Sequence, residues 1–185
     1  LNTDIFYNYE YAFYDSHLLS EFENFTSHYI RFSTKPFDFL NIQAGIGTGN
    51  EIAYREEIPE LGDRFSFNSS IEVTLNNNLR IKPSINFSKL QRLDSEDYYF
   101  DGYIARFDFR YQFTSSLNFR VISEYNNFTD QFFVQPLVSW RPNSDTIFYL
   151  GGNQNYIDEF IDYNSPNYRV NKSQLFFKFQ YLIKS

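Results

Sequence analysis

The sequence of 185 residues contains no cysteine and no methionine, and only seven glycines and six prolines. Without cysteine, the chain cannot build the disulfide framework that holds many small secreted domains together. Its uninterrupted apolar stretches, such as residues 147–150, are a few residues long, whereas a membrane-spanning helix needs about 20 apolar residues. Acidic residues outnumber basic ones (23 against 16, net charge −7), which disfavours nucleic-acid binding because phosphate contacts need a basic surface.

Aromatic residues are abundant: 23 Phe, 16 Tyr and one Trp make up 22% of the chain. A disordered acidic segment lacks such residues, so that class is excluded. The aromatic and aliphatic residues recur at every second position and alternate with polar or charged ones. The clearest stretches are residues 5–13, 65–75, 103–113 and 175–183. A period of two predicts strands whose two faces meet different environments, and the chain is predicted to be all-β.

Turn signals divide the chain into about ten strands. We place them at residues 4–13, 23–34, 38–47, 64–75, 79–90, 100–113, 117–126, 131–141, 146–154 and 173–184. Tight connections (34–37, 76–78, 114–116, 142–145) alternate with longer ones (15–22, 48–63, 91–99, 127–130, 155–172). This is the pattern of an up-and-down meander whose two ends face different media. We expect both termini on the periplasmic side and the loops 48–63 and 155–172 outside.

Strands of this length match the 9–11 residues that a tilted strand needs to cross a membrane. The predicted fold is therefore an antiparallel up-and-down transmembrane β-barrel, apolar outside and polar inside. Residues 1–185 are expected to form one barrel domain or the C-terminal fragment of a larger barrel, as a mature product or a piece of a longer protein. Tyr125, Trp140, Tyr149 and Tyr181 are predicted at the membrane interfaces, where amphipathic rings are favoured.

The polar face supplies the candidate functional residues, which would face the lumen. They are Glu72, Arg80, Lys82, Arg106, Asp108, Arg110, Arg120, Glu124, Gln135, Lys178 and Gln180. Such a wall could select what enters a pore, or it could be a self-neutralising ladder that only fills the interior. Centring the hairpins on residues 77 and 115 predicts three cross-strand pairs. These are Glu72 with Lys82, Arg106 with Glu124, and the like-charged pair Arg110 with Arg120.

Several motifs carry the likeness to a known family. They are Lys35-Pro36, residues 49–54 with Leu61-Gly62, residues 107–114, 123–130 and 140–148, and the terminal strand 175–184. In these motifs the chain resembles the C-terminal part of a large outer-membrane β-barrel domain of unknown function from Bacteroidota. That domain usually follows a family-9-like carbohydrate-binding module. Asn143 stands where the pattern usually has Gly. Because family members are several times longer, the resemblance implies a fragment whose strands need not close on themselves, and it transfers no catalytic residue.

Other chemistry has weak support. The chain has only two histidines, His17 and His28, and no cysteine. A metal site is therefore not expected, because metal ions are usually held by several convergent His, Cys or carboxylate ligands. The glycine-rich stretch 45–50 lacks the following helix that a phosphate loop requires. The acidic loops 94–97 and 158–162 could attract divalent cations but lack calcium-loop spacing. No nucleophile or carboxylate dyad is visible, so we predict no enzymatic activity, no cofactor and no metal.

For function, the sequence predicts a porin-like protein of a Gram-negative outer membrane that transports, secretes or docks a partner. Expected partners are outer-membrane lipid, other outer-membrane or periplasmic proteins, and the remaining strands of the same barrel. A soluble β-sandwich that binds carbohydrate on exposed aromatic rings is the alternative. A barrel hydrolase is a third reading, without a visible nucleophile arrangement.

Overall fold

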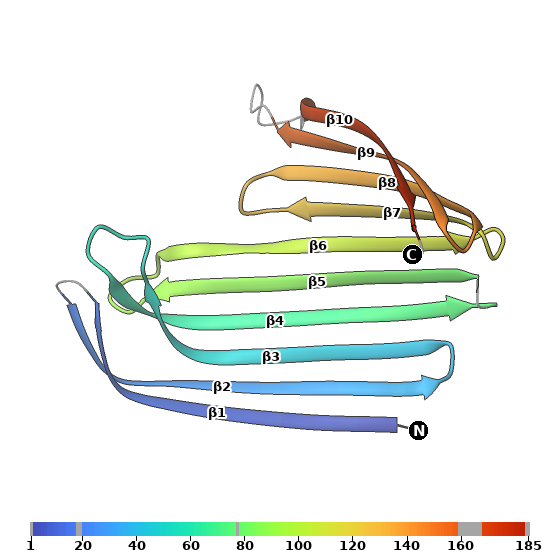
Figure 1. The fold of residues 1–185 in the computed structure, drawn as a ribbon. Helices are drawn as coiled ribbons and strands as arrows, with labels where there is room; N and C mark the ends of the chain where they lie inside the picture. The colour runs from blue at the N-terminus through green and yellow to red at the C-terminus, as the bar shows by residue number, and fades with distance from the viewer. Residues whose placement is uncertain (1, 18–19, 77, 159–167, 184–185) are drawn as a thin grey trace. The chain divides into compact units, whose positions relative to one another are not determined.

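A computed structural model of the chain describes residues 2–17, 20–76, 78–158 and 168–183. Within these ranges, ten antiparallel strands form one sheet in chain order, from β1 at one edge to β10 at the other (Figure 1). The strands are β1 (Asn2–His17), β2 (Ser20–Phe37), β3 (Leu40–Ala53), β4 (Glu60–Leu75), β5 (Leu79–Arg92), β6 (Tyr98–Gln112), β7 (Leu117–Asn126), β8 (Gln131–Asn143), β9 (Thr146–Asp158) and β10 (Tyr168–Tyr181). No helix in the described ranges is long and apolar enough to span a membrane.

The all-β, up-and-down order is confirmed, but several predicted boundaries are wrong. The first two strands continue through most of the predicted loop at 15–22, and the predicted loop at 48–63 shrinks to residues 54–59. The turn predicted at 34–37 lies at Asp38 and Phe39. The described sheet is also not closed, so the barrel itself remains a prediction.

The contacts divide the chain into two units, Leu1–Ile71 with Ser84–Ile104, and Glu72–Pro83 with Ala105–Ser185. In the first unit, the cross-strand pairs of β1, β2 and β3 define two faces, because directly opposed residues share a face of the sheet. Ile5 pairs with Phe32, and Phe32 pairs with Ala44. Intervening positions form the opposite face, on which Arg31 pairs with Gly45. We call these the apolar face and the polar face.

In the second unit, the pairing of β7 to β10 produces the same division. On the apolar face, successive pairs make one row of Leu117, Trp140, Phe148 and Phe179, and another of Tyr125, Phe132, Tyr156 and Val170. On the polar face, Asn118 pairs with Ser139, Ser139 with Tyr149, and Tyr149 with Lys178. The prediction that Tyr149 belongs to an outward aromatic girdle is therefore wrong: it shares the polar face with Lys178.

Burial is inverted relative to a water-soluble domain. Among the described side chains, five hydrophobic ones are buried, while thirty large hydrophobic ones are exposed. The exposed set includes Ile5 (74%), Leu175 (79%) and Phe177 (67%), all in regular strands. Monomeric soluble proteins rarely expose contiguous apolar patches of more than a few hundred Å². The apolar face thus lacks a cover within the described chain.

Glycines on the polar face of the first unit are covered by an aromatic ring. A Cβ at Gly45 would collide with the hydroxyl end of Tyr29, whereas one at Gly47 would collide with the hydroxyl of Ser66 and would lie in ordinary contact, at 3.4 Å, with the ring of Tyr29. The Tyr29 hydroxyl also accepts a 3.1 Å hydrogen bond from the side-chain amide of Asn68. The glycine-rich stretch is therefore strand β3 with a ring packed against its backbone, rather than a phosphate loop.

Candidate functional site

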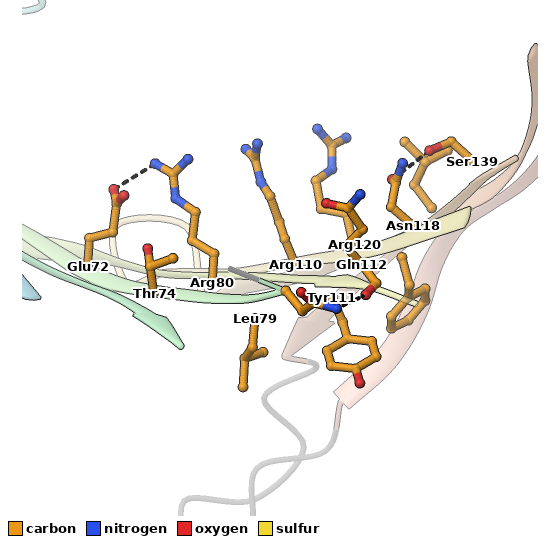
Figure 2. Close-up of a pocket in the computed structure, with 13 residues that line it drawn as sticks. Glu72, Thr74, Leu79, Arg80, Arg110, Tyr111, Gln112, Asn118, Arg120 and Ser139 are labelled. Atoms are coloured by element: carbon orange, nitrogen blue, oxygen red, sulfur yellow. Dashed lines mark hydrogen bonds and ion pairs between the residues drawn. The ribbon is translucent and has the colours of Figure 1, made fainter. Parts of the chain in front are cut away.

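A groove lined by arginines lies on the polar face of the second unit, with a volume of about 590 Å³. Its polar lining consists of Glu72, Thr74, Asn78, Arg80, Arg110, Gln112, Asn118, Arg120 and Ser139. Figure 2 shows the side chains of Arg80, Arg110 and Arg120 projecting to one side of the sheet. Leu79 and Tyr111 project to the other side. Alternation along each strand therefore delivers the charged groups to one wall.

Glu72 and Arg80 line the groove and form an ion pair. Arg80 Nη2 donates to Glu72 Oε2 at 2.6 Å, and the carboxylate is the more buried partner. The predicted partner of Glu72 was Lys82, two residues further along β5. Because side chains two residues apart on a strand share a face, Lys82 lies on the same face as Arg80. The carboxylate of Glu72, however, forms its ion pair with Arg80 and not with Lys82.

Two further ion pairs lie on the polar side of β6. Arg106 Nη1 donates to Glu124 Oε2 on β7 at 3.2 Å, which confirms the predicted contact between these two residues. Arg110 binds Asp108, two positions away on its own strand, through Nε and Nη2, each at 3.0 Å. This two-bond geometry leaves Nη1 of Arg110 as the nitrogen outside the pair and fixes the orientation of the guanidinium.

Arg120 lines the same groove as Arg110; it makes no ion pair within 4 Å in the described part of the chain, although its charge acts on the carboxylate of Asp108. In Figure 2 the two side chains project to the same side of the sheet, and both line the groove. The Nε atom of Arg120 is buried and has no hydrogen-bond partner among the described residues. Like charges placed together on neighbouring strands are destabilising, and the carboxylate of Asp108, on which both arginines act, offsets part of that repulsion.

The remaining candidates lie farther along the same face. Gln135 pairs with Ile122, Gln180 with Ile147, and Lys178 with Tyr149. The Lys178 ammonium also lies 5.8 Å from the centre of the Tyr149 ring, within the range of a cation–π contact. These residues share the polar face, but they do not line the arginine groove.

The groove also contains uncharged polar residues that the sequence analysis did not predict. The hydroxyl of Ser139 donates to the side-chain oxygen of Asn118 across the β7–β8 pair, and Thr74 lines the groove beside Arg80. Their positions have the same strand parity as the predicted charged residues, which is the signal that identifies them. Arg141 lines an adjoining hollow with Ser139, so the basic wall extends toward the end of β8.

A second charged cluster lies in the first unit, where β5 ends and β6 begins. Arg92 binds Glu60 at 2.8 Å and Glu56 at 3.2 Å, and its guanidinium lies 4.2 Å from the centre of the Tyr99 ring. The Tyr99 hydroxyl donates to Glu60. Burial and this hydrogen bond raise the pKa of Tyr99 to about 12. The cluster ties the 54–59 loop to the ends of β4 and β5.

Within the described side chains, the other sequence candidates do not assemble into a metal site. His28 shares a 2.9 Å hydrogen bond with the Tyr7 hydroxyl and lies beside the Tyr9 ring. The side chain of His17 and the loop predicted at 158–162 lie outside the residues whose side chains are described. Across the described ranges, no group of three His, Asp or Glu side chains is arranged to hold a metal ion.

Comparison with known proteins leaves the geometry as the main guide. No protein-family model matches the chain, and no curated protein matches it. The two faces of the sheet and the arginine groove are therefore the features of the molecule that bear on its function.

Proposed function

We propose that the chain forms the wall of an antiparallel β-barrel in a Gram-negative outer membrane, with its apolar face toward lipid and its polar face toward a lumen. Its role is to transport, secrete or dock a partner. The supporting observation is the inverted burial: thirty large hydrophobic side chains are exposed and five hydrophobic ones are buried among the described residues. Lipid is the solvent that makes such a surface favourable.

The spacing of the aromatic rows supports this assignment. The row containing Trp140 and the row containing Phe132 lie eight residues apart on β8. At a rise of about 3.4 Å per residue, they are separated by about 27 Å along the strand. A tilt of about 40° reduces this to about 21 Å across the membrane, close to the apolar band of roughly 25 Å in outer-membrane barrels. Trp and Tyr in such rows suit the two interfaces.

Closure of the sheet is part of the proposal. The described sheet ends at β1 and β10, whose outer edges have no neighbour in the strand order. In lipid, each unpaired backbone group costs several kcal/mol. These edges therefore pair with each other, with further strands of the same protein, or with a partner. The resemblance to the Bacteroidota barrel domain favours additional strands.

The alternative, a soluble β-sandwich that binds carbohydrate, requires two sheets that pack face to face. The described strands instead follow one another in a single sheet, and this observation favours the barrel. The proposal assigns no catalytic residue and no cofactor.

Membrane insertion is tested by refolding the purified chain into lipid vesicles. The expected result is flotation with the vesicles, resistance to carbonate extraction and protection of the strands from added protease. A chain that stays monomeric and soluble without detergent, and does not float with vesicles, would contradict the proposal.

A further inference from the structure

We infer that the arginine groove is a binding site for solutes that carry a phosphate or sulfate group. The inference rests on the proposed function in one respect, since it treats the polar face as the lumen. It adds the chemical class of the solute and the residues that recognise it.

The predicted lumen wall carries more basic than acidic residues. Among the eleven candidate residues on the predicted lumen side, six are basic and three are acidic, although the whole chain carries a net charge of −7. The three carboxylates are occupied by Arg80, Arg106 and Arg110. The positive excess therefore remains on Lys82, Arg120 and Lys178, on a wall where counter-charge from the described chain is already used.

Arg120 has a hydrogen-bond donor that no described residue satisfies. Arg110 and Arg120 project from the same side of the sheet and both line the groove, and the Nε atom of Arg120 is buried without a hydrogen-bond partner in the described residues. The Asp108 carboxylate interacts electrostatically with both arginines but forms hydrogen bonds with Arg110 alone, so an anion bound at Arg120 supplies the counter-charge and the hydrogen bond that this guanidinium lacks. Asp108 already fixes the orientation of Arg110, so little side-chain freedom is lost when the anion binds.

The hydrogen-bond donors that line the groove suit an oxyanion. Guanidinium groups present planar forks that match the oxygens of phosphate and carboxylate. Arg80 uses Nη2 for Glu72 and Arg110 uses Nε and Nη2 for Asp108, which leaves other N–H groups of both arginines for a ligand. Thr74 and Asn118 add neutral polar groups around the same groove. A tetrahedral oxyanion, with several oxygens, can accept from three arginines at once.

The groove also has a defined place along the strands. Asn78 and Gln112, which exchange backbone and side-chain hydrogen bonds with each other, both line it. They lie beside the tight turns that end β4 and β6. In the proposed orientation the groove faces the periplasmic mouth, where an anionic solute would be held at entry or exit.

The test uses the full chain refolded into neutral-lipid vesicles, with inorganic phosphate and inorganic sulfate as probes in calorimetric titrations at fixed ionic strength. Arg120→Gln removes the unpaired charge, and its expected effect is a loss of affinity of about tenfold to a hundredfold, the range for a hydrogen bond to a charged group. Arg31→Gln is the matched control: it removes the same charge from the polar face of the first unit and should change affinity less than twofold.

Arg120→Lys keeps the charge without the planar fork, so it should fold if Arg120→Gln does not, and should retain part of the affinity. Saturable binding that depends on Arg120 supports the inference. An inserted, protease-protected chain that does not bind the probes, or that responds equally to Arg120→Gln and Arg31→Gln, overturns the inference and leaves the barrel intact. A chain that does not insert but still binds phosphate through Arg120 overturns the membrane proposal and keeps the site.

Discussion

Leu175→Arg discriminates most sharply between a sheet in lipid and a sheet in water. Leu175 lies on the apolar face of β10, opposite Gly152, and is 79% exposed. Leu175 lies four residues from Phe179, which belongs to the row containing Trp140. It lies five residues from Val170, which belongs to the row containing Phe132. With a rise of about 3.4 Å per residue and a tilt of about 40°, it lies roughly 10 Å inside either row. Leu175 is therefore near the midplane of the proposed membrane.

An arginine at the midplane of a barrel's lipid face costs about 2–4 kcal/mol. Since about 1.4 kcal/mol is a factor of ten, the folding equilibrium constant in lipid should fall by roughly thirtyfold to several hundredfold. In water the prediction is the opposite. An exposed leucine replaced by arginine loses little packing, so the free energy of unfolding should stay within about 0.5 kcal/mol.

The assay is reversible urea unfolding in lipid vesicles, followed by fluorescence of the single tryptophan, Trp140. Gln174→Arg is the control, because Gln174 is the adjacent residue of the same strand and pairs with Asn153 on the polar face. It should change the free energy of unfolding by less than about 1 kcal/mol. Equal effects of the two substitutions would refute the assignment of the faces.

Three further predictions concern packing and charge. Gly45→Val should destabilise the fold by about 1–3 kcal/mol, measured by the same urea titration, because its side chain displaces the Tyr29 ring; no effect would show that the ring does not cover the strand. A double-mutant cycle of Arg106→Ala and Glu124→Ala should yield a coupling of about 0.2–1 kcal/mol, since both side chains are partly exposed, and zero coupling would contradict the pair. Because folding raises the pKa of Tyr99 to about 12, its contribution to stability is complete below its ordinary pKa of 10 and is lost as the pH rises toward 12. The difference in the free energy of unfolding between the native chain and Tyr99→Phe should therefore shrink between pH 10 and 12. A difference that does not change with pH would contradict the hydrogen bond from Tyr99 to Glu60.

Strand identity and order were predictable from the sequence, whereas strand ends were not. Alternation of apolar and polar residues marks the parts of a strand that have two different faces. Near residues 15–22 and at both ends of 48–63 that contrast fades, although the chain continues as paired backbone in β1 to β4. Backbone pairing needs no apolar side chain, so a search based on hydrophobic period ends too early.

Cross-strand ion pairs were predictable at one hairpin and not at another. Arg106 and Glu124 meet across the β6–β7 turn as predicted. The β4–β5 hairpin instead joins Glu72 to Arg80 and contains Asn76 with a φ of 51°, a left-handed backbone conformation that a residue count does not reveal.

The facing of Tyr149 illustrates a different limit. Residues 147–150 are apolar at every position, so the local alternation does not show which of them belongs to the polar face. Only the pairing with Ser139 and Lys178 places Tyr149 on the polar face. The groove was likewise out of reach: charge and parity place its arginines on one wall, but its volume and the buried Nε of Arg120 depend on how neighbouring side chains pack.

The depth of Trp140 in a bilayer tests the central claim most directly. Trp140 is on the apolar face, 47% exposed, stacked on Phe148 in one aromatic row. Vesicles containing lipids brominated at different chain depths report where this single indole lies. The account predicts strong quenching by bromines near the headgroups, weaker quenching by bromines at the bilayer centre, and protection from aqueous iodide. Quenching by iodide without quenching by any brominated lipid would contradict it.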